Sequence, residues 1–362
     1  MNRSALVQDW FFAPGGSEEV AIELAGLLPG ADVYTTFMEP EFQPRLAGHR
    51  VHPWPIQRLL GPTRRYRSLL PIYPFWFQSL DLRAYDLVVS SSSAFAKAVR
   101  TRPDARHIAY IHAPMRYAWD LEGYLAGSSL SLPSRMAART LRPLLRRWDV
   151  ATSRRPDELI ANSAAVADRI RRFWGRDSRV IHPPVDVEGV PLGTSDGGFL
   201  LVAARLLAYR RLDLAVSAAN RLGRDLVIVG VGPELKRLQA LAGPTVQFVG
   251  RVSRGALYDL MGRAHAYLVP GEEDFGMAPV EAMAAGTPVV AFAAGGALET
   301  VVDGVTGVFF DRPEIDSVVK AIDRVDGLAR DREVIRAHAE RFSRRVFRGR
   351  FHELLGLNDR EG

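Results

Sequence analysis

An acidic, glycine-containing segment in the second half of the chain has residue types suited to binding an anionic ligand rich in hydroxyl groups. The segment runs from Pro270 to Val290 and follows the strand-like residues 266–269. Ligands bind an open α/β sheet at the carboxyl ends of its strands, so we expect the segment to lie at that edge. Gly276 permits close backbone approach, and the helix predicted after it offers unpaired N–H groups to an anion. The segment therefore predicts a phosphate-binding site.

Two glutamates of this segment are suited to binding sugar hydroxyls. Glu273 lies in the predicted loop, and Glu281 follows eight positions later on the predicted helix. Carboxylates accept hydrogen bonds from vicinal hydroxyls, which a sugar or a ribose provides. A single glutamate is more typical of a solvated surface charge. The ordered string around this pair favours contacts with two parts of one extended ligand.

Two groups of basic residues in the first half could contact an acceptor or an anionic membrane surface. The first group has steps of three and four that place several guanidinium groups on one side of a helix: Arg135, Arg139, Arg142, Arg146 and Arg147. The second lies among aromatic residues of segment 59–77: Arg58, Arg64, Arg65 and Arg67. Basic residues beside exposed aromatics suit an anionic membrane. The alternative is solvated arginine over aromatics that belong to the core.

Parallel sheets are predicted as the framework that positions these residues, because short apolar runs alternate with helical periodicity. Strands are predicted in the first half at 4–9, 31–36, 86–90, 107–112 and 158–161. In the second half they are predicted at 198–203, 225–229, 245–249, 265–269, 288–292 and 307–310. The predicted fold class is therefore α/β, with two Rossmann-like domains.

The domain boundaries follow from length and from one segment rich in Pro and Gly. The chain has 362 residues, which predicts about two domains. We place a first domain at 1–185, a linker at 186–197 and a second domain at 198–335. Residues 336–362 are predicted to form a terminal helix that packs back on the first domain. The first 190 residues hold 25 Lys and Arg against 19 Asp and Glu, so the net charge of +6 lies there.

Composition excludes several classes of protein. The chain has no cysteine, so disulfides, thiolate metal sites and cysteine nucleophiles are excluded. No apolar run approaches the roughly 20 residues that span a bilayer, and the N-terminus lacks the features of a signal peptide. We therefore expect a cytoplasmic protein, with peripheral binding at the inner face of the plasma membrane as its only membrane contact.

The acidic segment resembles the E-x7-E motif of retaining family-4 glycosyltransferases of the GT-B fold. The resemblance covers the string from Glu273 to Val289 and continues through residues 294–307. It implies that Glu273 holds hydroxyls of the donor hexose and that Glu281 holds the nucleotide ribose. It also implies that the backbone amides of Phe275, Gly276 and Met277 face the sugar and phosphates.

A second segment resembles the part of the family in which an Arg and, five residues later, a Lys hold the donor diphosphate. This segment is residues 204–213, in which Arg205 matches the Arg and Arg210 stands at the Lys position. Arg keeps the charge but presents a planar fork, so its contact with phosphate differs from that of Lys. Without the resemblance, both arginines are typical surface residues at a helix start.

The first half resembles a subgroup that includes polysaccharide mannosyltransferases. The resemblance lies in the Gly-rich turn with Gly15 and Gly16, in residues 85–97, and in residues 110–120 around His112. It implies that Gly15 and Gly16 lie against the diphosphate and acceptor. It further implies that His112 touches the transferred sugar while its carbonyl supports the anomeric centre.

The resemblance implies a GT-B enzyme that transfers a hexose with retention to a glycan or a polyprenyl-diphosphate-linked saccharide. Likeness to the subgroup favours GDP-mannose as donor, and a UDP-hexose is the alternative. No D-x-D triplet occurs, so we expect Arg residues and helix dipoles to neutralise the diphosphate, with no metal and no cofactor. A non-catalytic basic module that binds membrane or nucleic acid and a nucleotide-sugar epimerase are rivals; the acidic loop argues against nucleic acid as a partner.

Overall fold

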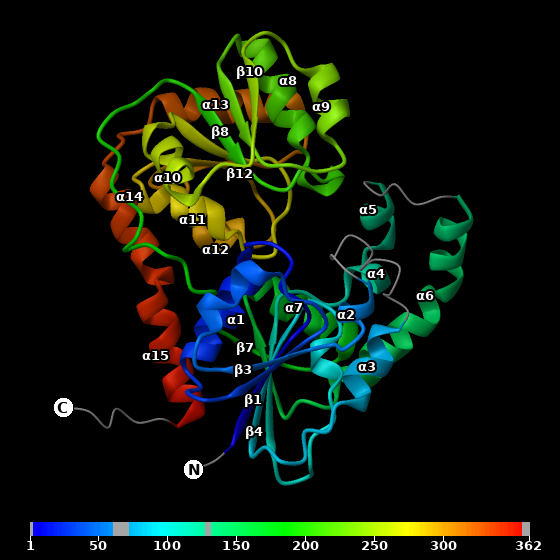
Figure 1. The fold of residues 1–362 in the computed structure, drawn as a ribbon. Coiled ribbons are helices and arrows are strands. Elements are labelled where there is room, and N and C mark those ends of the chain that lie inside the picture. Colours follow the sequence, from blue (N-terminus) through cyan, green and yellow to red (C-terminus); the bar gives the residue numbers. More distant parts are fainter. Residues whose placement is uncertain (1–2, 61–71, 127–131, 357–362) are drawn as a thin grey trace, which may run out of the picture. The chain divides into compact units, whose positions relative to one another are not determined.

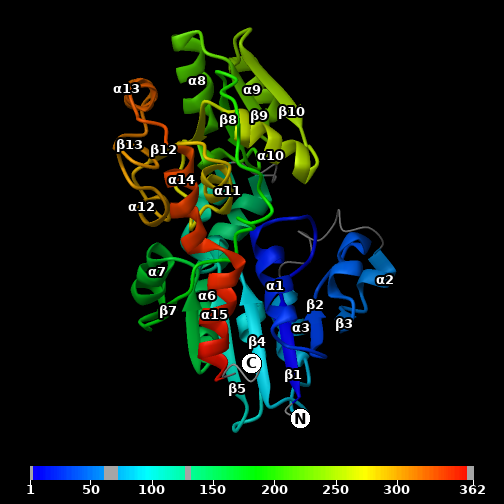
Figure 2. The ribbon, with the colours of Figure 1, turned by 90° about the vertical axis from the view of Figure 1, so that its left-hand side faces the viewer.

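The computed structural model describes residues 3–60, 72–126 and 132–356, which form two compact units (Figure 1). The first unit contains residues 1–121, 137–184 and 347–362, and the second contains residues 122–136 and 185–346. Each unit has its own sheet with helices on both faces, as Figures 1 and 2 show. The predicted α/β class with two Rossmann-like domains is confirmed.

The sheet of the first unit has seven strands in the order β3-β2-β1-β4-β5-β6-β7, and all neighbouring pairs are parallel. The strands are β1 Ser4–Gln8, β2 Asp32–Thr35, β3 Arg50–Pro53, β4 Leu87–Ser92, β5 Arg106–Ile111, β6 Glu158–Ala161 and β7 Arg179–Val180. Because successive side chains of a strand point to opposite faces, Leu6 and Val89 pack on one side while Ala5 and Val88 pack on the other.

Helices cover both faces of this first sheet. The helical elements up to residue 184 are α1 Gly16–Gly26, η1 Pro40–Phe42, η2 Pro44–Leu46, α2 Gln57–Leu60, α3 Tyr73–Ser79, η4 Ala96–Ala98, α4 Arg116–Trp119, α5 Leu121–Ala126, α6 Leu132–Ser153 and α7 Ala164–Trp174. Of these, α5 from residue 122 and the start of α6 belong to the second unit. Helix α1 packs on the face of Leu6, and α3 packs on the face of Ala5. Helix α7 is capped by Ser163, whose side chain accepts a hydrogen bond from the backbone N–H of Val166.

The sheet of the second unit has six parallel strands in the order β10-β9-β8-β11-β12-β13. The strands are β8 Leu200–Ala203, β9 Leu226–Val229, β10 Val246–Gly250, β11 Ala266–Val269, β12 Val289–Phe292 and β13 Gly307–Phe310. The helical elements of this unit are η5 Ala208–Arg210, α8 Leu212–Leu222, α9 Leu235–Leu241, α10 Arg254–Arg263, α11 Met277–Ala284, α12 Ala297–Thr300, α13 Ile315–Asp326, α14 Arg332–Ala339 and η6 Glu340–Phe342. The last helix, α15 Arg344–Leu355, begins in this unit and continues into the first unit from Phe347.

All eleven predicted strands are present, and two further strands were not predicted. Strand β3 is polar and lies at the sheet edge, so it lacks the apolar run that identifies a buried strand. Strand β7 has only two residues. Short edge strands of this kind leave little pattern in a sequence.

The C-terminal helix α15 completes the core of the first unit. Phe347 and Phe351 are fully buried and pack against the Tyr110 ring of β5. Arg348 forms an ion pair with Glu23 of α1, with 2.7 Å between Nη2 and Oε2. The backbone carbonyl of Leu354 accepts a hydrogen bond from Arg106 of β5. These contacts tie α15 to β5 and α1 of the first unit.

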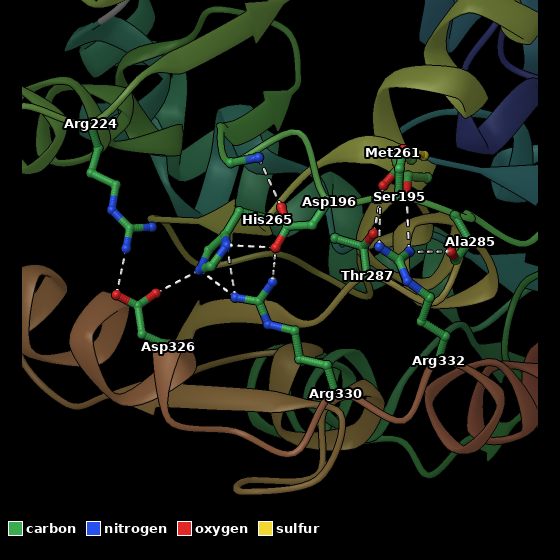
Figure 3. A network of polar contacts seen from close by, with 12 residues as sticks. Ser195, Asp196, Arg224, Met261, His265, Ala285, Thr287, Asp326, Arg330 and Arg332 are labelled. Carbon is green, nitrogen blue, oxygen red and sulfur yellow. Dashed lines mark hydrogen bonds and ion pairs between the residues drawn. The ribbon is translucent and has the colours of Figure 1, made fainter.

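Segment 186–197 lies against the second unit through backbone and side-chain contacts (Figure 3). The carbonyl of Ser195 accepts a hydrogen bond from Arg332. The Asp196 carboxylate contacts His265, 3.0 Å away, and also Arg330. His265 Nε2 lies 2.6 Å from the Asp326 carboxylate at the end of α13. The network thus joins the segment to the start of β11 and to α13.

A buried ion pair holds the C-terminal part of α6 in the first unit. Lys97 of η4 donates to Asp149 of α6, with 2.6 Å between Nζ and Oδ1, and both side chains are buried. The other carboxylate oxygen of Asp149 accepts hydrogen bonds from the indoles of Trp119 and Trp174. The pair is therefore satisfied on both sides, which a buried charge requires.

A buried histidine of β5 makes the stability of the first unit depend on pH. His107 is 1% exposed, and its Nε2 lies 3.0 Å from Ser90 Oγ. Burial lowers the pKa of His107 to about 4 from 6.5; the charge of Asp157 opposes this effect, whereas Arg155 and Arg176 add to it. The folded protein therefore binds this proton less readily than the unfolded chain.

We predict that acidification from pH 6.5 to 4 lowers the free energy of unfolding in part through His107. The neutral imidazole is favoured in the folded state, so its contribution is present above pH 6.5 and is lost as pH falls through this window. One linked proton gives a slope of at most about 1.4 kcal/mol per pH unit. Denaturant titrations of the wild type and His107→Gln across this range measure the effect. An equal slope in both proteins would contradict the assignment.

Candidate functional site

His112 is held at four points in the first unit, at the carboxyl ends of three neighbouring strands. Its backbone N–H donates to the carbonyl of Ser92, and its carbonyl accepts from Asn162 Nδ2 at 3.0 Å. Its Nε2 lies 2.8 Å from Ser91 Oγ, and its ring meets the Tyr110 ring at 5.2 Å between centroids. The position predicted for His112 after a strand is therefore found, and the residue is rigidly oriented.

The Ser91 hydroxyl orients the imidazole and is itself buried. Ser91 is fully buried at the end of β4, so it lacks the exposure that a nucleophile needs. The preceding residue Ser90 contacts His107 in the same way on the opposite face of the sheet. Asn162 was not predicted, because its signal is only a polar residue directly after the apolar strand β6.

The Gly-rich turn that was predicted to lie at the diphosphate and acceptor joins β1 to α1. Gly15 precedes the first helical residue, Gly16. A Cβ atom built on Gly15 would lie 2.9 Å from Glu18 Oε2, so a larger residue would displace this carboxylate. Glu18 is 6% exposed and accepts a hydrogen bond from Ser17 Oγ. A buried carboxylate beside this turn was also not predicted.

Arg210 and Glu273 come together in the second unit. Their side chains form an ion pair between Arg210 Nη1 and Glu273 Oε1, with 21% and 17% of the side chains exposed. Because β8 and β11 are neighbours, the loops after these strands meet at one edge of the sheet. Arg205 lies on the same loop as Arg210 and is exposed. The following residue, Arg211, has a left-handed backbone with φ 52°.

The loop after β11 is shaped by close backbone approaches. Gly276 has φ 89°, a left-handed conformation that favours glycine, and precedes the first residue of α11, Met277. A Cβ atom on Gly296 would lie 2.3 Å from Phe275 Cα, so this close passage also requires glycine. The Phe275 side chain is buried against Phe342, with 5.5 Å between the ring centroids.

Glu281 faces helix α10. The Tyr258 hydroxyl accepts a hydrogen bond from Arg254 Nε at 2.7 Å, and it lies 3.5 Å from Glu281 Oε1. Arg254 Nη2 is 3.6 Å from the same carboxylate oxygen. Burial, and next the negative charge of Glu281, raise the pKa of Tyr258 to about 12, so its hydroxyl stays protonated at neutral pH.

The arginines predicted to form an acceptor or membrane surface differ in their contacts and exposure. Arg142 and Arg146 of α6 both donate to the Ala118 carbonyl at the end of α4, at 3.1 and 2.9 Å. Arg139 is exposed and Arg135 half-exposed on the same helix. Arg64 and Arg65 lie outside the described residues.

The aromatic residues beside the second basic group are mostly buried. Tyr73, Trp76 and Phe77 of α3 are in the core, whereas Phe75 is 70% exposed. Within the described parts of the chain, no helix is long and apolar enough to cross a membrane. Among the same residues, no group of three acidic or histidine side chains is arranged to hold a metal ion.

Each half of the chain matches a family model. Residues 14–188 match the family model described as Glycosyltransferase Family 4, and residues 192–341 match the model described as Glycosyl transferases group 1. The chain is 31% identical over 198 residues to the D-inositol 3-phosphate glycosyltransferase of Mycolicibacterium smegmatis, which covers 46% of this chain and 46% of that protein. The match therefore spans less than half of that relative.

Solved structures with the same fold cover nearly the whole chain. Anabaena Alr3699/HepE in complex with UDP and glucose has a TM-score of 0.72 at 19% identity, covering 98% of this chain and all of that one. The sucrose-phosphate synthase of Thermosynechococcus elongatus has a TM-score of 0.71 at 17% identity, covering 99% of both chains. The two parallel-sheet units thus form a GT-B fold.

We predict that Arg210 and Glu273 stabilise each other in the folded protein. Removal of one partner leaves a largely buried charge without its counterion, whereas removal of both does not. In a double-mutant cycle with Arg210→Ala and Glu273→Ala, we expect a coupling of about 1–3 kcal/mol, measured by urea unfolding. Strictly additive effects would show that the pair contributes nothing to stability.

Proposed function

We propose that this chain, which joins a Glycosyltransferase Family 4 domain to a Glycosyl transferases group 1 domain, is a retaining hexosyltransferase that uses a nucleotide-sugar. The observation that carries the proposal is the ion pair between Arg210 and Glu273, beside the N-terminus of α11. It combines, at one sheet edge, a cation for a diphosphate and a carboxylate for sugar hydroxyls. The matches of both halves to glycosyltransferase domain models support it.

The roles of the site residues follow from their chemistry and from the family resemblance. Arg205 and Arg210 stabilise the departing diphosphate, together with the backbone N–H groups around Gly276. Glu273 holds hydroxyls of the hexose, and Glu281 holds the ribose. The His112 carbonyl supports the positive charge that develops at the anomeric carbon. Gly15 and Gly16 let the backbone approach the diphosphate and acceptor.

Retention follows if the acceptor attacks on the face from which the diphosphate leaves. The bond from the anomeric carbon to the phosphate oxygen breaks, and a bond to the acceptor oxygen forms. The acceptor proton passes to the leaving diphosphate, so no nucleophilic side chain is required. The contributions of the protein are orientation and charge stabilisation, without a metal or a cofactor.

The donor is proposed to be GDP-mannose, and the acceptor a glycan or a polyprenyl-diphosphate-linked saccharide. The resemblance of the first half to polysaccharide mannosyltransferases supports this choice. A UDP-hexose is the second candidate, because HepE, which has the same fold, was crystallised with UDP-glucose. With either donor, we propose that the protein acts in polysaccharide or glycolipid synthesis in the cytoplasm.

We predict that a nucleoside diphosphate raises the melting temperature, because a ligand that binds only the folded state stabilises it. A panel of GDP, UDP, ADP, GDP-mannose and UDP-glucose, with and without magnesium, measures this shift. A GDP-selective shift supports GDP-mannose as the donor, and a UDP-selective shift supports a UDP-hexose.

We expect Glu273→Ala to lower turnover by about 100-fold or more while the chain remains folded. No shift with any nucleotide, or full activity of Glu273→Ala, would contradict the proposal.

We further propose that the outer face of α6 contacts an anionic membrane, where a lipid-linked acceptor would reside. Residues 132–148 include five arginines and no acidic residue. Leu141 and Leu144 are 47% and 64% exposed, and Arg139 and Arg147 are exposed on the same helix. Apolar side chains flanked by cations match the acyl boundary and the negative headgroups of such a surface.

We predict salt-sensitive flotation of the protein with phosphatidylglycerol vesicles and weak flotation with phosphatidylcholine vesicles. Leu141→Ser with Leu144→Ser should lower binding by about tenfold, because less apolar surface enters the membrane. Leu298→Ser in the second unit, where Leu298 is 58% exposed, is the matched control and should bind as the wild type does. An equal loss of vesicle binding in both variants, or no flotation of the wild type, would contradict the proposed membrane contact.

A further inference from the structure

A side-chain amide is hydrogen-bonded to the backbone carbonyl of His112, and we infer that Asn162 is a positioning residue for this carbonyl during sugar transfer. The inference rests on the proposed function, in which the carbonyl supports the anomeric centre. Asn162 is 6% exposed and follows β6, the neighbour of β5 in the sheet. Its Nδ2 donates to the His112 carbonyl at 3.0 Å.

The orientation of the Asn162 amide is fixed from its other side. Ser163 Oγ donates to Asn162 Oδ1 at 3.1 Å, and Ser163 is fully buried. The same hydroxyl accepts from the backbone N–H of Val166 at the start of α7. The amide oxygen is thereby directed at Ser163, and the amide N–H groups are directed at the carbonyl of His112.

The backbone around His112 also depends on these neighbouring strands. The N–H of Asn162 donates to the carbonyl of Ile111, and the N–H of His112 donates to the carbonyl of Ser92. His112 lies one residue beyond the end of β5, so its carbonyl is beyond the ladder pairs of β5 with β6. The Asn162 side chain therefore supplies the donor that the ladder does not.

A carbonyl oxygen has two lone-pair directions, and only one is used by Asn162. Fixing that direction also fixes where the second lone pair and the carbonyl dipole point. Stabilisation of charge by a dipole is greatest when the dipole is oriented before the charge develops. The side chains assigned to the donor phosphates and ribose, Arg205, Arg210 and Glu281, belong to the second unit, so Asn162 should affect the chemical step and leave donor binding unchanged.

The test compares Asn162→Asp, Asn162→Ala and the control Asn220→Asp. Asp has the size of Asn but, when ionised, offers no hydrogen-bond donor. Asn220 likewise donates to a backbone carbonyl, that of Leu241 at 2.8 Å, but in the second unit. The assay is release of nucleoside diphosphate by hydrolysis of GDP-mannose or UDP-glucose, whichever gives the larger rise in melting temperature, with water accepting the hexose. Melting followed by circular dichroism, with and without the nucleotide, verifies folding and donor binding.

We expect Asn162→Ala to lower kcat by about tenfold or more, with KM for the donor unchanged. Asn162→Asp should lower kcat by a similar factor at pH 8, where the introduced carboxyl is ionised. As pH falls, the carboxyl at position 162 gains a proton and can donate to the carbonyl again, so kcat of Asn162→Asp relative to wild type should rise. The residue whose carbonyl is bound, His112, also carries a titratable imidazole, and its Nε2 lies 2.8 Å from Ser91 Oγ. Asn162→Ala keeps that imidazole and should show no such rise.

Wild-type kcat in Asn162→Asp, an equal loss in Asn220→Asp, or the absence of recovery at low pH would overturn the inference while the proposed function stands. A wild-type protein that neither binds nor turns over either nucleotide-sugar would instead overturn the proposed function, and this inference with it.

Discussion

Parallel pairing of the strands is the constraint that brings together the candidate donor-site residues. All strands of a parallel sheet end at the same edge, so short loops after different strands meet there. In the first unit this edge collects Ser91, His112 and Asn162 from three adjacent strands. In the second unit it collects Arg210 and Glu273. The residues within each group are far apart in the sequence, and the strand order brings them together.

The same constraint explains what the sequence could predict. Buried parallel strands are nearly continuous apolar runs, so eleven strands and the loops after them were recognisable. Glu273 and His112 could be singled out as candidates because they follow such runs within strings that resemble a known family. The domain matches and the GT-B fold agree with that resemblance, whereas the mannosyltransferase subgroup remains a proposal.

Contacts between distant loops could not be predicted in the same way. The pairing of Arg210 with Glu273 requires that β8 and β11 be neighbours, which no local pattern specifies. Asn162 belongs to no recognisable sequence motif. Its side chain reaches the His112 carbonyl because the two residues follow the neighbouring strands β6 and β5. The arginines of α6 share a helical spacing, which predicts one basic face. Arg142 and Arg146 nevertheless donate hydrogen bonds to the Ala118 carbonyl. Periodicity specifies a face of a helix but not what covers it.

The position of α15 has a consequence for how the protein is made. Phe347 and Phe351 fill the core of the first unit beside Tyr110, although that unit is otherwise built from residues before 185. A ribosome synthesises a chain from its N-terminus, and domains commonly fold as they emerge. Here the first unit cannot close its core until residues 347–355 have left the ribosome. Most of the second unit is encoded later, at residues 185–346, and yet the unit is complete at Val346, so its folding can precede completion of the first.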